Sequence, residues 1–236
     1  MKTWVFIPAY RPRLGQLRRC LSSARWPAEK VVVVSNGASD ERLGVYDVPQ
    51  GVQIYQDPQD DINISRWWAI GMTAAIHNGA TEVLLLNTDA QISRRGIQTL
   101  GEALYELDVS VCGPDYRGVC KDPNFPLLNS PKINRSRSQI PWTHRVPGFC
   151  MMVRVEDAIS DYYQIYPDEE MRWWYSDDDI EWQAREARGT ALIPGVEVRH
   201  PPAGGTLLDE TLGRWAQEDL AKFVAKWGSE PCLPAT

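Results

Sequence analysis

Residues 82–89 read Glu-Val-Leu-Leu-Leu-Asn-Thr-Asp, an aliphatic run that stops at three polar residues. Successive aliphatic side chains leave a strand no polar face, which is typical of a strand buried on both sides in a parallel sheet. Because ligands bind outside the carboxyl ends of such strands, we expect the three polar residues at a binding edge. The stretch therefore predicts an α/β fold with Asn87, Thr88 and Asp89 at its site.

The first half of the chain alternates between strand-like and helix-like patterns. Short apolar runs predict strands, and apolar residues three or four positions apart predict helices. The predicted strands are Thr3–Ile7, Lys30–Ser35, Val52–Tyr55 and Glu82–Leu86, and the predicted helices are Leu14–Ala24, Ile64–His77 and Arg94–Leu107. This alternation predicts a mostly parallel, twisted sheet flanked by helices.

The second half of the chain is less regular. Cys112–Arg145 is rich in Pro, Gly, Asn and Ser, which predicts a long loop of functional importance. The segments predicted after it are a strand at Val146–Val155, a helix at Ser176–Arg188, a strand at Thr190–Arg199 and a terminal helix at Leu212–Trp227. We find no repeat and no linker, so we expect a single domain.

Composition excludes several classes of protein. The chain has 236 residues, 43% hydrophobic residues and a formal net charge of −6, which is typical of a globular protein and argues against a dedicated nucleic-acid binder. Its five scattered cysteines form no disulfide or zinc-finger pattern, which favours a reducing compartment. No apolar run reaches the length of a membrane span, and the first one stops at Pro8, too short for a secretory signal. We therefore predict a cytoplasmic protein without an integral membrane segment.

Other predicted strand ends carry polar or aromatic residues. The first strand leads into Pro8-Ala9-Tyr10-Arg11, the second into Ser35-Asn36-Gly37-Ala38-Ser39-Asp40, and a late strand into His200. Each segment taken alone is equally compatible with an ordinary turn, because Asn, Gly, Asp and Pro are turn residues. Their shared position at strand ends favours one composite ligand site.

Asp89 and His200 form a candidate metal site. A carboxylate at the end of a buried strand suits a divalent cation that bridges two phosphates. His200 could complete the coordination, and mixed carboxylate and imidazole ligation favours Mn²⁺ over Ca²⁺. The alternative for His200 is an ordinary histidine before the turn at Pro201-Pro202.

A second cluster of chemistry-bearing residues is Ser176-Asp177-Asp178-Asp179-Ile180-Glu181-Trp182, preceded by Trp173-Trp174-Tyr175. Crowded, partly buried carboxylates raise one another's pKa, and an aromatic wall beside them is suited to a sugar ring held against a general base. The alternative is helix capping, because Ser and Asp favour the first turn of a helix. We expect Asp177 to serve as the cap.

Taken in order, these segments resemble the inverting GT-A glycosyltransferases, the large family-2-like group of nucleotide-diphospho-sugar transferases. The resemblance covers roughly Thr3 to His200. The segments that carry it are Val5–Tyr10, Val33–Asp40, Asn63–Gly71, Leu85–Asp89 (an Asn-x-Asp form of the Asp-x-Asp metal motif), Val146–Met152, and Asp178–Trp182 with Arg185 and Gly189.

The resemblance implies a metal-dependent enzyme that moves a sugar from a nucleotide-diphosphate sugar, above all a UDP-sugar, to a hydroxyl acceptor with inversion. It implies Asp179 as the general base with Asp178 beside it, and Mn²⁺ or Mg²⁺ on Asp89 and His200. The expected donor contacts are Pro8, Ala9, Tyr10, Arg11, Asn36, Asp40, Asn63, Arg66, Asn87 and Thr88, with Tyr10 and Asn36 flanking the base of the nucleotide. The expected acceptor contacts are Gly148, Trp173, Trp174 and Glu181.

The same resemblance implies one GT-A domain over residues 1–228. Residues 1–110 would form the nucleotide-sugar-binding half, 111–211 the acceptor and catalytic half, and 212–228 a terminal helix, with a Pro-rich tail at 229–236. The acceptor stays open between a saccharide, a lipid, a protein and a modified nucleic acid, and the oligomeric state also stays open. The basic segment Lys132–Arg145 could close over donor phosphates, touch an anionic acceptor, or be a solvated loop.

Two other functions compete with this one. A sugar-1-phosphate nucleotidyltransferase would need a Gly-rich phosphate loop after the first strand, and Arg11–Gly15 offers a single Gly. A non-catalytic nucleotide-sugar or carbohydrate-binding protein suits the ten tryptophans. It does not suit the crowded carboxylates of Asp177–Asp179, because buried unpaired charge is costly without a catalytic or metal-binding function.

Overall fold

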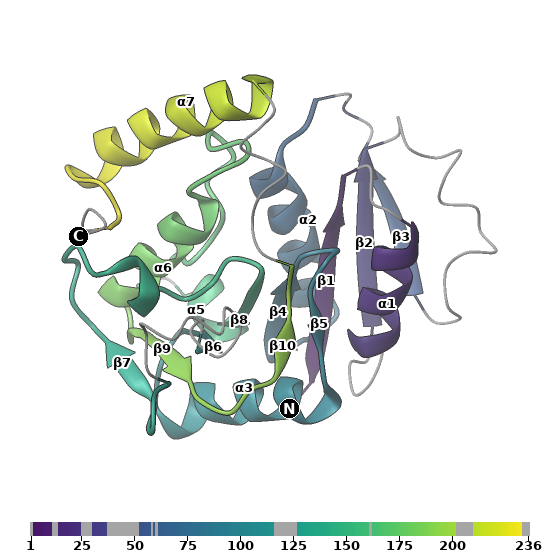
Figure 1. The fold of residues 1–236 in the computed structure, drawn as a ribbon, viewed down its shortest axis with the longest axis horizontal. Helices are drawn as coiled ribbons and strands as arrows, with labels where there is room; N and C mark the ends of the chain where they lie inside the picture. Colours follow the sequence, from purple (N-terminus) through teal and green to yellow (C-terminus); the bar gives the residue numbers. More distant parts are fainter. Residues whose placement is uncertain are drawn as a thin grey trace.

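The structure is a computed structural model that describes residues 2–10, 14–24, 30–36, 52–57, 59, 61–115, 127–160, 162–201 and 210–232. Its centre is an eight-stranded sheet in the order β3-β2-β1-β4-β8-β6-β9-β7 (Figure 1). The strands are β1 (Thr3–Ala9), β2 (Lys30–Asn36), β3 (Val52–Asp57), β4 (Glu82–Leu86), β6 (Val111–Pro114), β7 (Lys132–Asn134), β8 (Cys150–Arg154) and β9 (Thr190–Ile193).

Most strands of the sheet point the same way. The neighbours β3, β2, β1 and β4 are parallel, as are β6 and β9, whereas β8 and β7 run antiparallel to the strands beside them. The first four of these strands along the chain form one side of the sheet, and the other four form the other side. The predicted α/β fold with a mostly parallel, helix-flanked sheet is confirmed.

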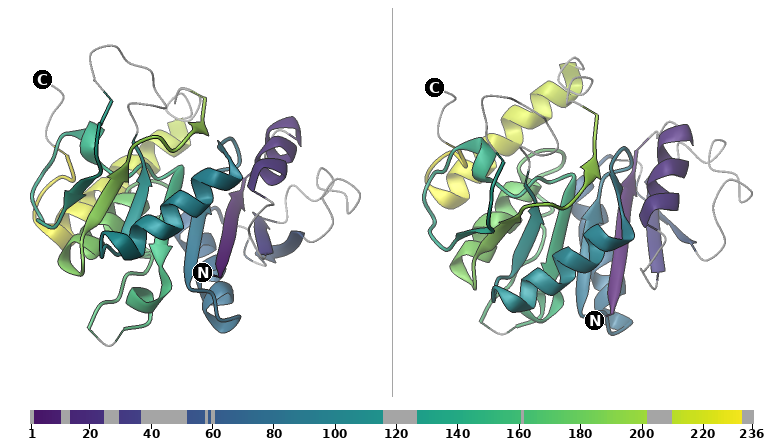
Figure 2. Two further views of the ribbon diagram at one scale, coloured as in Figure 1. Left: turned by 90° about the horizontal axis from the view of Figure 1, so that it is seen from below. Right: turned by 60° about the horizontal axis from the view of Figure 1, so that its bottom comes forward.

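Helices cover both faces of the first half of the sheet (Figure 2). Helix α2 (Ile64–His77) packs its tryptophans and methionine against one face, and α1 (Leu14–Ala24) and α3 (Arg94–Glu106) pack against the other. The packing on α2 is so close at Gly71 that an added Cβ would overlap the ring of Phe6. The predicted bounds of α1, α2 and β4 coincide with the observed ones.

Short elements in the second half differ from the prediction. The segment predicted as one long loop contains β6, β7 and a 3-10 turn at Trp142–His144. The predicted strand Thr190–Arg199 is two strands, because the chain turns at Gly195, which has a φ of 74°. Its second part, β10 (Val198–Arg199), pairs with β5 (Gln91–Ile92) in a separate two-stranded sheet.

The C-terminal helix α7 (Glu210–Trp227) lies across α6 (Ser176–Glu186) at the upper left of Figure 1. Its Phe223 is fully buried and meets the ring of Trp182 at 5.4 Å, nearly perpendicular to it. Helix α7 thus closes an apolar cluster that also contains Met171 and Trp182. Within the described ranges, no helix has the length and apolar character that a bilayer crossing requires.

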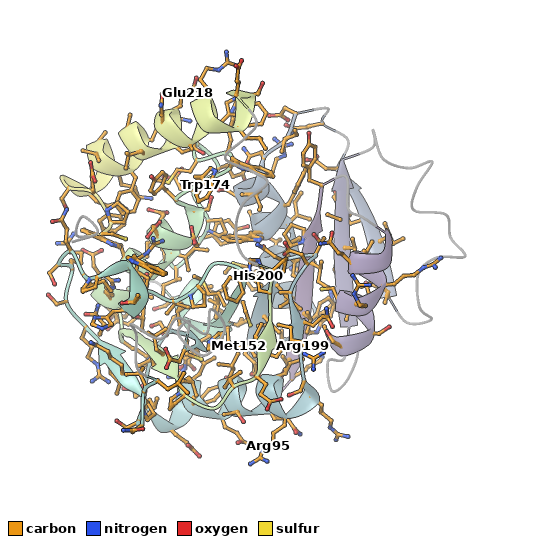
Figure 3. All side chains as sticks on the ribbon, in the orientation of Figure 1. Arg95, Met152, Trp174, Arg199, His200 and Glu218 are labelled. Carbon is orange, nitrogen blue, oxygen red and sulfur yellow. The ribbon has the colours of Figure 1, made fainter. Side chains whose placement is uncertain are left out.

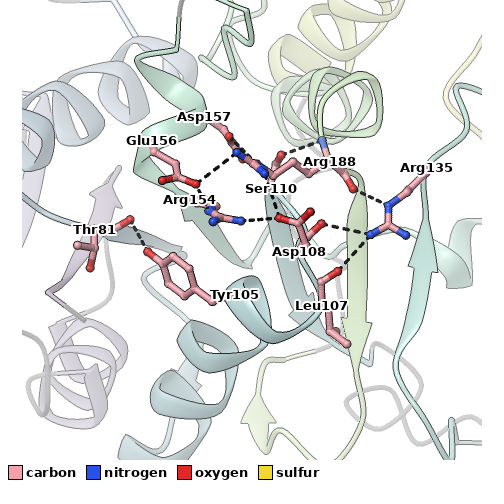
Figure 4. A network of polar contacts seen from close by, with 10 residues as sticks. All are labelled: Thr81, Tyr105, Leu107, Asp108, Ser110, Arg135, Arg154, Glu156, Asp157 and Arg188. Carbon is pink, nitrogen blue, oxygen red and sulfur yellow. Dashed lines mark hydrogen bonds and ion pairs between the residues drawn. The ribbon is translucent and has the colours of Figure 1, made fainter.

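A polar network ties the amino ends of β6 and β9 to the last residue of β8 (Figure 4). Asp108, in a left-handed turn with a φ of 46°, accepts hydrogen bonds from Arg154 and Arg188 at 3.1 and 3.0 Å. Arg135 donates to the backbone carbonyls of Leu107 and Asp108. Because these groups lie at the end of the sheet opposite the carboxyl ends of its parallel strands, we assign them to stability rather than to ligand binding.

Candidate functional site

The ends of β1, β2 and β4 lie side by side, as the sequence predicted. Ala9 pairs with Ser35 at the end of β2, and β4 pairs with β1 up to Phe6 and Leu85. β1 continues through Pro8 to Ala9, and Tyr10 follows directly, half-buried. Asn87 and Thr88 form the turn after β4, where the Asn87 amide donates to the carbonyl of Phe149 at 3.0 Å.

Asp89 and His200 meet at this edge although they are far apart in sequence. The pairing of β5 with β10 brings them together, because β5 begins just after Asp89 and β10 ends just before His200. The His200 Nε2 lies 3.3 Å from Asp89 Oδ1, and the His200 ring stacks on Phe149 with centroids 4.1 Å apart. The structure therefore unites the two residues that the sequence proposed as metal ligands.

The donor atoms of this pair suit a divalent cation. A carboxylate oxygen and an imidazole nitrogen are ligands that Mn²⁺ accepts, and Mg²⁺ would rely more on oxygen. No cluster of three or more His, Cys, Asp or Glu side chains suited to a metal occurs among the described residues. Two protein ligands leave room for phosphate oxygens and water around a bound ion, which is the arrangement expected where the metal is shared with a substrate.

Arg66 and Asn63 are held by the protein itself, which argues against their predicted contacts with donor phosphates. Arg66 donates to Asp57 through Nε at 2.9 Å and lies 2.8 Å from Asp61, so two carboxylates neutralise its charge. The Trp67 indole donates to the same Asp57 oxygen at 2.8 Å. Asn63 caps α2 by accepting from the Arg66 amide and donates to the carbonyl of Glu169. Both side chains therefore stabilise the fold through these contacts.

Some predicted donor contacts cannot be placed. Arg11 and Asp40 lie outside the described residues, and so does the side chain of Asn36. The backbone of Asn36 ends β2, paired with Asp57 of β3.

The residue before α6 has an unusual backbone conformation. Tyr175 occupies the N-cap position in the left-handed region, with a φ of 65° and without a side-chain capping bond. A bulky residue rarely adopts this conformation, and such strain persists only where the surroundings hold it. Here the Tyr175 ring packs on Phe223 of α7, with centroids 6.1 Å apart. The predicted cap, Asp177, is therefore not the cap.

Two of the acidic side chains of α6 are fixed by arginines. Asp178 is buried in an ion pair with Arg145, and Glu181 is buried 2.6 Å from Arg185, one helical turn further on. Burial raises the pKa of Asp178 well above its usual range, although Arg145 opposes this effect. Burial likewise raises the pKa of Glu181, opposed by Arg185 and Arg145. Neither carboxylate presents a free surface to an acceptor.

Asp179, the predicted general base, lies beneath α7. Its side chain is fully buried. Oδ1 accepts from the indole of Trp227 at 2.7 Å and faces Lys226 at 2.9 Å, while Oδ2 accepts from Gln183 at 2.6 Å. Both oxygens thus accept from protein donors in this structure.

Asp177 occupies a different position. Its side chain keeps 27% of its surface exposed and lies 3.7 Å from Arg145. An added Cβ at Gly148 would overlap the Asp177 carboxylate, so the two residues are in close contact. Gly148 precedes Phe149, whose ring covers His200. Asp177 is the acidic residue of α6 that contacts the residue before Phe149, and the sequence analysis did not foresee this because it depends on the contact with Gly148.

The predicted acceptor tryptophans are positioned by α7. The buried carboxylate of Asp219 accepts from the consecutive amides of Arg172, Trp173 and Trp174 at 3.1, 2.8 and 3.0 Å. The Trp173 ring lies nearly perpendicular to the Tyr10 ring, with centroids 5.7 Å apart, which joins the segment before α6 to the end of β1. In the view of Figure 3, Trp174 lies between α7 and His200.

A cavity of about 400 Å³ lies elsewhere, between β3 and α2, lined by Val32, Gln53, Ile54, Tyr55, Ile70 and Ala74. None of these lining residues carries a charged group. The cavity lies between the edge of the sheet and α2 rather than at the strand ends, so we do not assign it to the site.

Comparison with known proteins was made at the level of sequence and of structure. No protein-family model matches the chain, and no curated sequence matches it. Solved structures do match. The S. aureus TarS fragment 1-349 superimposes with a TM-score of 0.62 at 16% identity, over 95% of this chain and 72% of that one.

TarS structures with nucleotides match as well. The complex with UDP matches with a TM-score of 0.60 at 15% identity, over 93% of this chain and 65% of that one. The complex with UDP-GlcNAc matches with a TM-score of 0.55 at 14% identity, over 95% of this chain and 73% of that one. This chain spans 40% of a longer TarS structure. The chain therefore has a glycosyltransferase fold, the fold that TarS shares.

Proposed function

We propose that the protein is a metal-dependent inverting glycosyltransferase that moves a sugar from a nucleotide-diphosphate sugar to a hydroxyl acceptor. The observation that carries this proposal is the meeting of Asp89 and His200 at the carboxyl ends of parallel strands. In this fold, TarS binds UDP and UDP-GlcNAc, which supports a UDP-sugar as the donor.

Donor binding would use the edge formed by β1, β2 and β4. The backbone at Pro8–Tyr10 and at Asn36 ends neighbouring strands, so the nucleotide base would lie between the Tyr10 ring and the end of β2. The diphosphate would lie toward Asp89 and His200, beside Asn87 and Thr88. A bound Mn²⁺ or Mg²⁺ would supply positive charge that stabilises the departing diphosphate.

The acceptor would enter from the side of Trp173 and Trp174. The backbone amides of Trp173 and Trp174 donate to the Asp219 carboxylate, which fixes the segment that carries the two rings. The Trp173 ring also contacts Tyr10 of the donor side. Flat, rigid aromatic rings are suited to the apolar face of a sugar. A carboxylate on this side would remove the hydroxyl proton as the acceptor oxygen attacks the anomeric carbon from the face opposite the diphosphate.

The test of this proposal is release of UDP from a panel of UDP-sugars in MnCl₂, with and without saccharide acceptors. We expect UDP release from at least one donor, increased by an acceptor and abolished by EDTA. D89N should abolish release, whereas E102Q, the same change of charge on the exposed face of α3, should not affect it. Donor binding without release under any condition would support a binding protein instead.

A further inference from the structure

We propose that Asp177, rather than Asp179, is the general base of the transfer, with Gly148 and Arg145 as its positioning residues. This inference rests on the proposed transferase function and adds a catalytic residue to it. It follows from how the structure distributes the four neighbouring carboxylates of α6.

Protein partners occupy three of the four carboxylates. Asp178 is paired with Arg145, Glu181 with Arg185, and Asp179 with Lys226, Trp227 and Gln183. Their side chains are at most 3% exposed. A general base must reach the proton that it removes within hydrogen-bonding distance, and these three would first have to exchange their protein partners for the acceptor.

Asp177 differs from them in both exposure and pairing. Its side chain is 27% exposed, and the ion pair recorded for it among the described residues is the long one to Arg145, at 3.7 Å. Arg145 lies closer to Asp178 than to Asp177. Asp177 therefore keeps lone pairs that an incoming hydroxyl can use.

The direction of Asp177 follows from Gly148. The carboxylate fills the space that a side chain at position 148 would occupy. Residues 148 and 149 are consecutive, so their Cα atoms are about 3.8 Å apart. Phe149 accepts from the Asn87 amide through its carbonyl, and its ring stacks on His200, which faces Asp89. The carboxylate thus borders the segment that lies against the end of β4.

The start of α6 is held firmly enough to fix this direction. The strained Tyr175 packs on Phe223, and the hydroxyl groups of Ser176 and Ser65 hydrogen-bond to each other, which ties α6 to the first turn of α2. Successive helical residues point about 100° apart, so fixing this turn sends Asp177, Asp178 and Asp179 to three different surroundings.

The reaction step is balanced in atoms and electrons. The acceptor hydroxyl gives its proton to the Asp177 carboxylate while its oxygen forms a bond to the anomeric carbon. The bond from that carbon to the diphosphate oxygen breaks, and its electron pair leaves with UDP. The aspartic acid then returns its proton to water.

The experiment measures UDP release from UDP-GlcNAc in MnCl₂, with water and with saccharide acceptors, alongside UDP affinity by calorimetry. D177N should lower kcat by about 10²–10⁴-fold and leave the Kd for UDP within about twofold. G148A should lower kcat in the same way, because its Cβ displaces the same carboxylate, and combining it with D177N should add little further loss. E102Q is the matched control.

The outcomes separate the two claims. Near-normal turnover by D177N, or a folded D179N without turnover and with intact UDP binding, would overturn the assignment of the base. Wild-type protein that fails to bind UDP, or that binds UDP but turns over no donor, would instead refute the proposed function. Thermal melts of each variant show whether a loss reflects unfolding.

Discussion

The indole of Trp227 donates a hydrogen bond of 2.7 Å to Asp179, 48 residues earlier in the chain. This bond and the ion pair between Lys226 and Asp179 tie the last turn of α7 to the acidic first turn of α6. An aspartate that the sequence motif assigns to catalysis is thereby held by the C-terminal helix. This helix is consequently tied to α6 rather than being an appendage.

This relationship predicts that D179A destabilises the protein. The substitution leaves the Trp227 indole and the Lys226 ammonium without their buried acceptor, and unpaired partners of this kind cost about 1–3 kcal/mol each when buried. Because Lys226 is about one-third exposed, we expect a loss of about 2 kcal/mol in the free energy of unfolding. Urea unfolding at neutral pH measures it, and a change below about 0.5 kcal/mol would contradict the structural assignment.

The buried carboxyl group of Asp178 should make the free energy of unfolding depend on pH. Burial raises its pKa in the folded protein, against the opposing effect of Arg145, so the folded protein binds this proton more tightly than the unfolded chain. Its contribution to stability is therefore fully present below about pH 4 and decreases as the pH rises through the folded pKa. The difference in unfolding free energy between wild type and D178N should change in that direction between acid and neutral pH. A difference that stays constant with pH would disprove it.

Substitution of Asp219 should perturb mainly the segment that carries Trp173 and Trp174. D219N keeps the shape of the side chain but removes the charge that three backbone amides share. Hydrogen bonds to charged groups contribute about 1.5–3 kcal/mol, so we expect a loss of about 2 kcal/mol in stability and altered tryptophan fluorescence. E218Q, on the exposed side of the same helix, is the control. Identical melts for D219N and wild type would show that the amides do not need the carboxylate.

The sequence predicts the first half of the fold well for local reasons. Helix α2 begins at the capping Asn63 and ends before Asn78, both readable from residue type, and its apolar spacing sets the buried face. The strands β5, β7 and β10 are only two or three residues long. Elements this short have no periodicity to detect, and tertiary pairing alone defines them.

The site is predicted in part for a related reason. Asp89 comes shortly after the parallel strand β4, at the edge where ligands bind in this class of fold. His200 follows β10, whose antiparallel pairing with β5 brings it to the same edge. Strand-end position was enough to find both residues. Asp179 accepts a hydrogen bond from Trp227 of α7, and Arg66 donates to Asp57 of β3. No local sequence pattern predicts these contacts. The sequence shows that carboxylates crowd α6, but remote packing decides which one remains exposed.

The central claim is that the Asp89–His200 edge binds the diphosphate of a nucleotide sugar. Isothermal titration of UDP into wild-type protein, D89N and E102Q, each with MnCl₂ and with EDTA, tests it most directly. We predict binding to wild type and E102Q that weakens at least tenfold in EDTA, and equally weak binding to D89N with or without the metal. Absence of UDP binding to the wild type, or affinities that neither D89N nor EDTA changes, would contradict the claim.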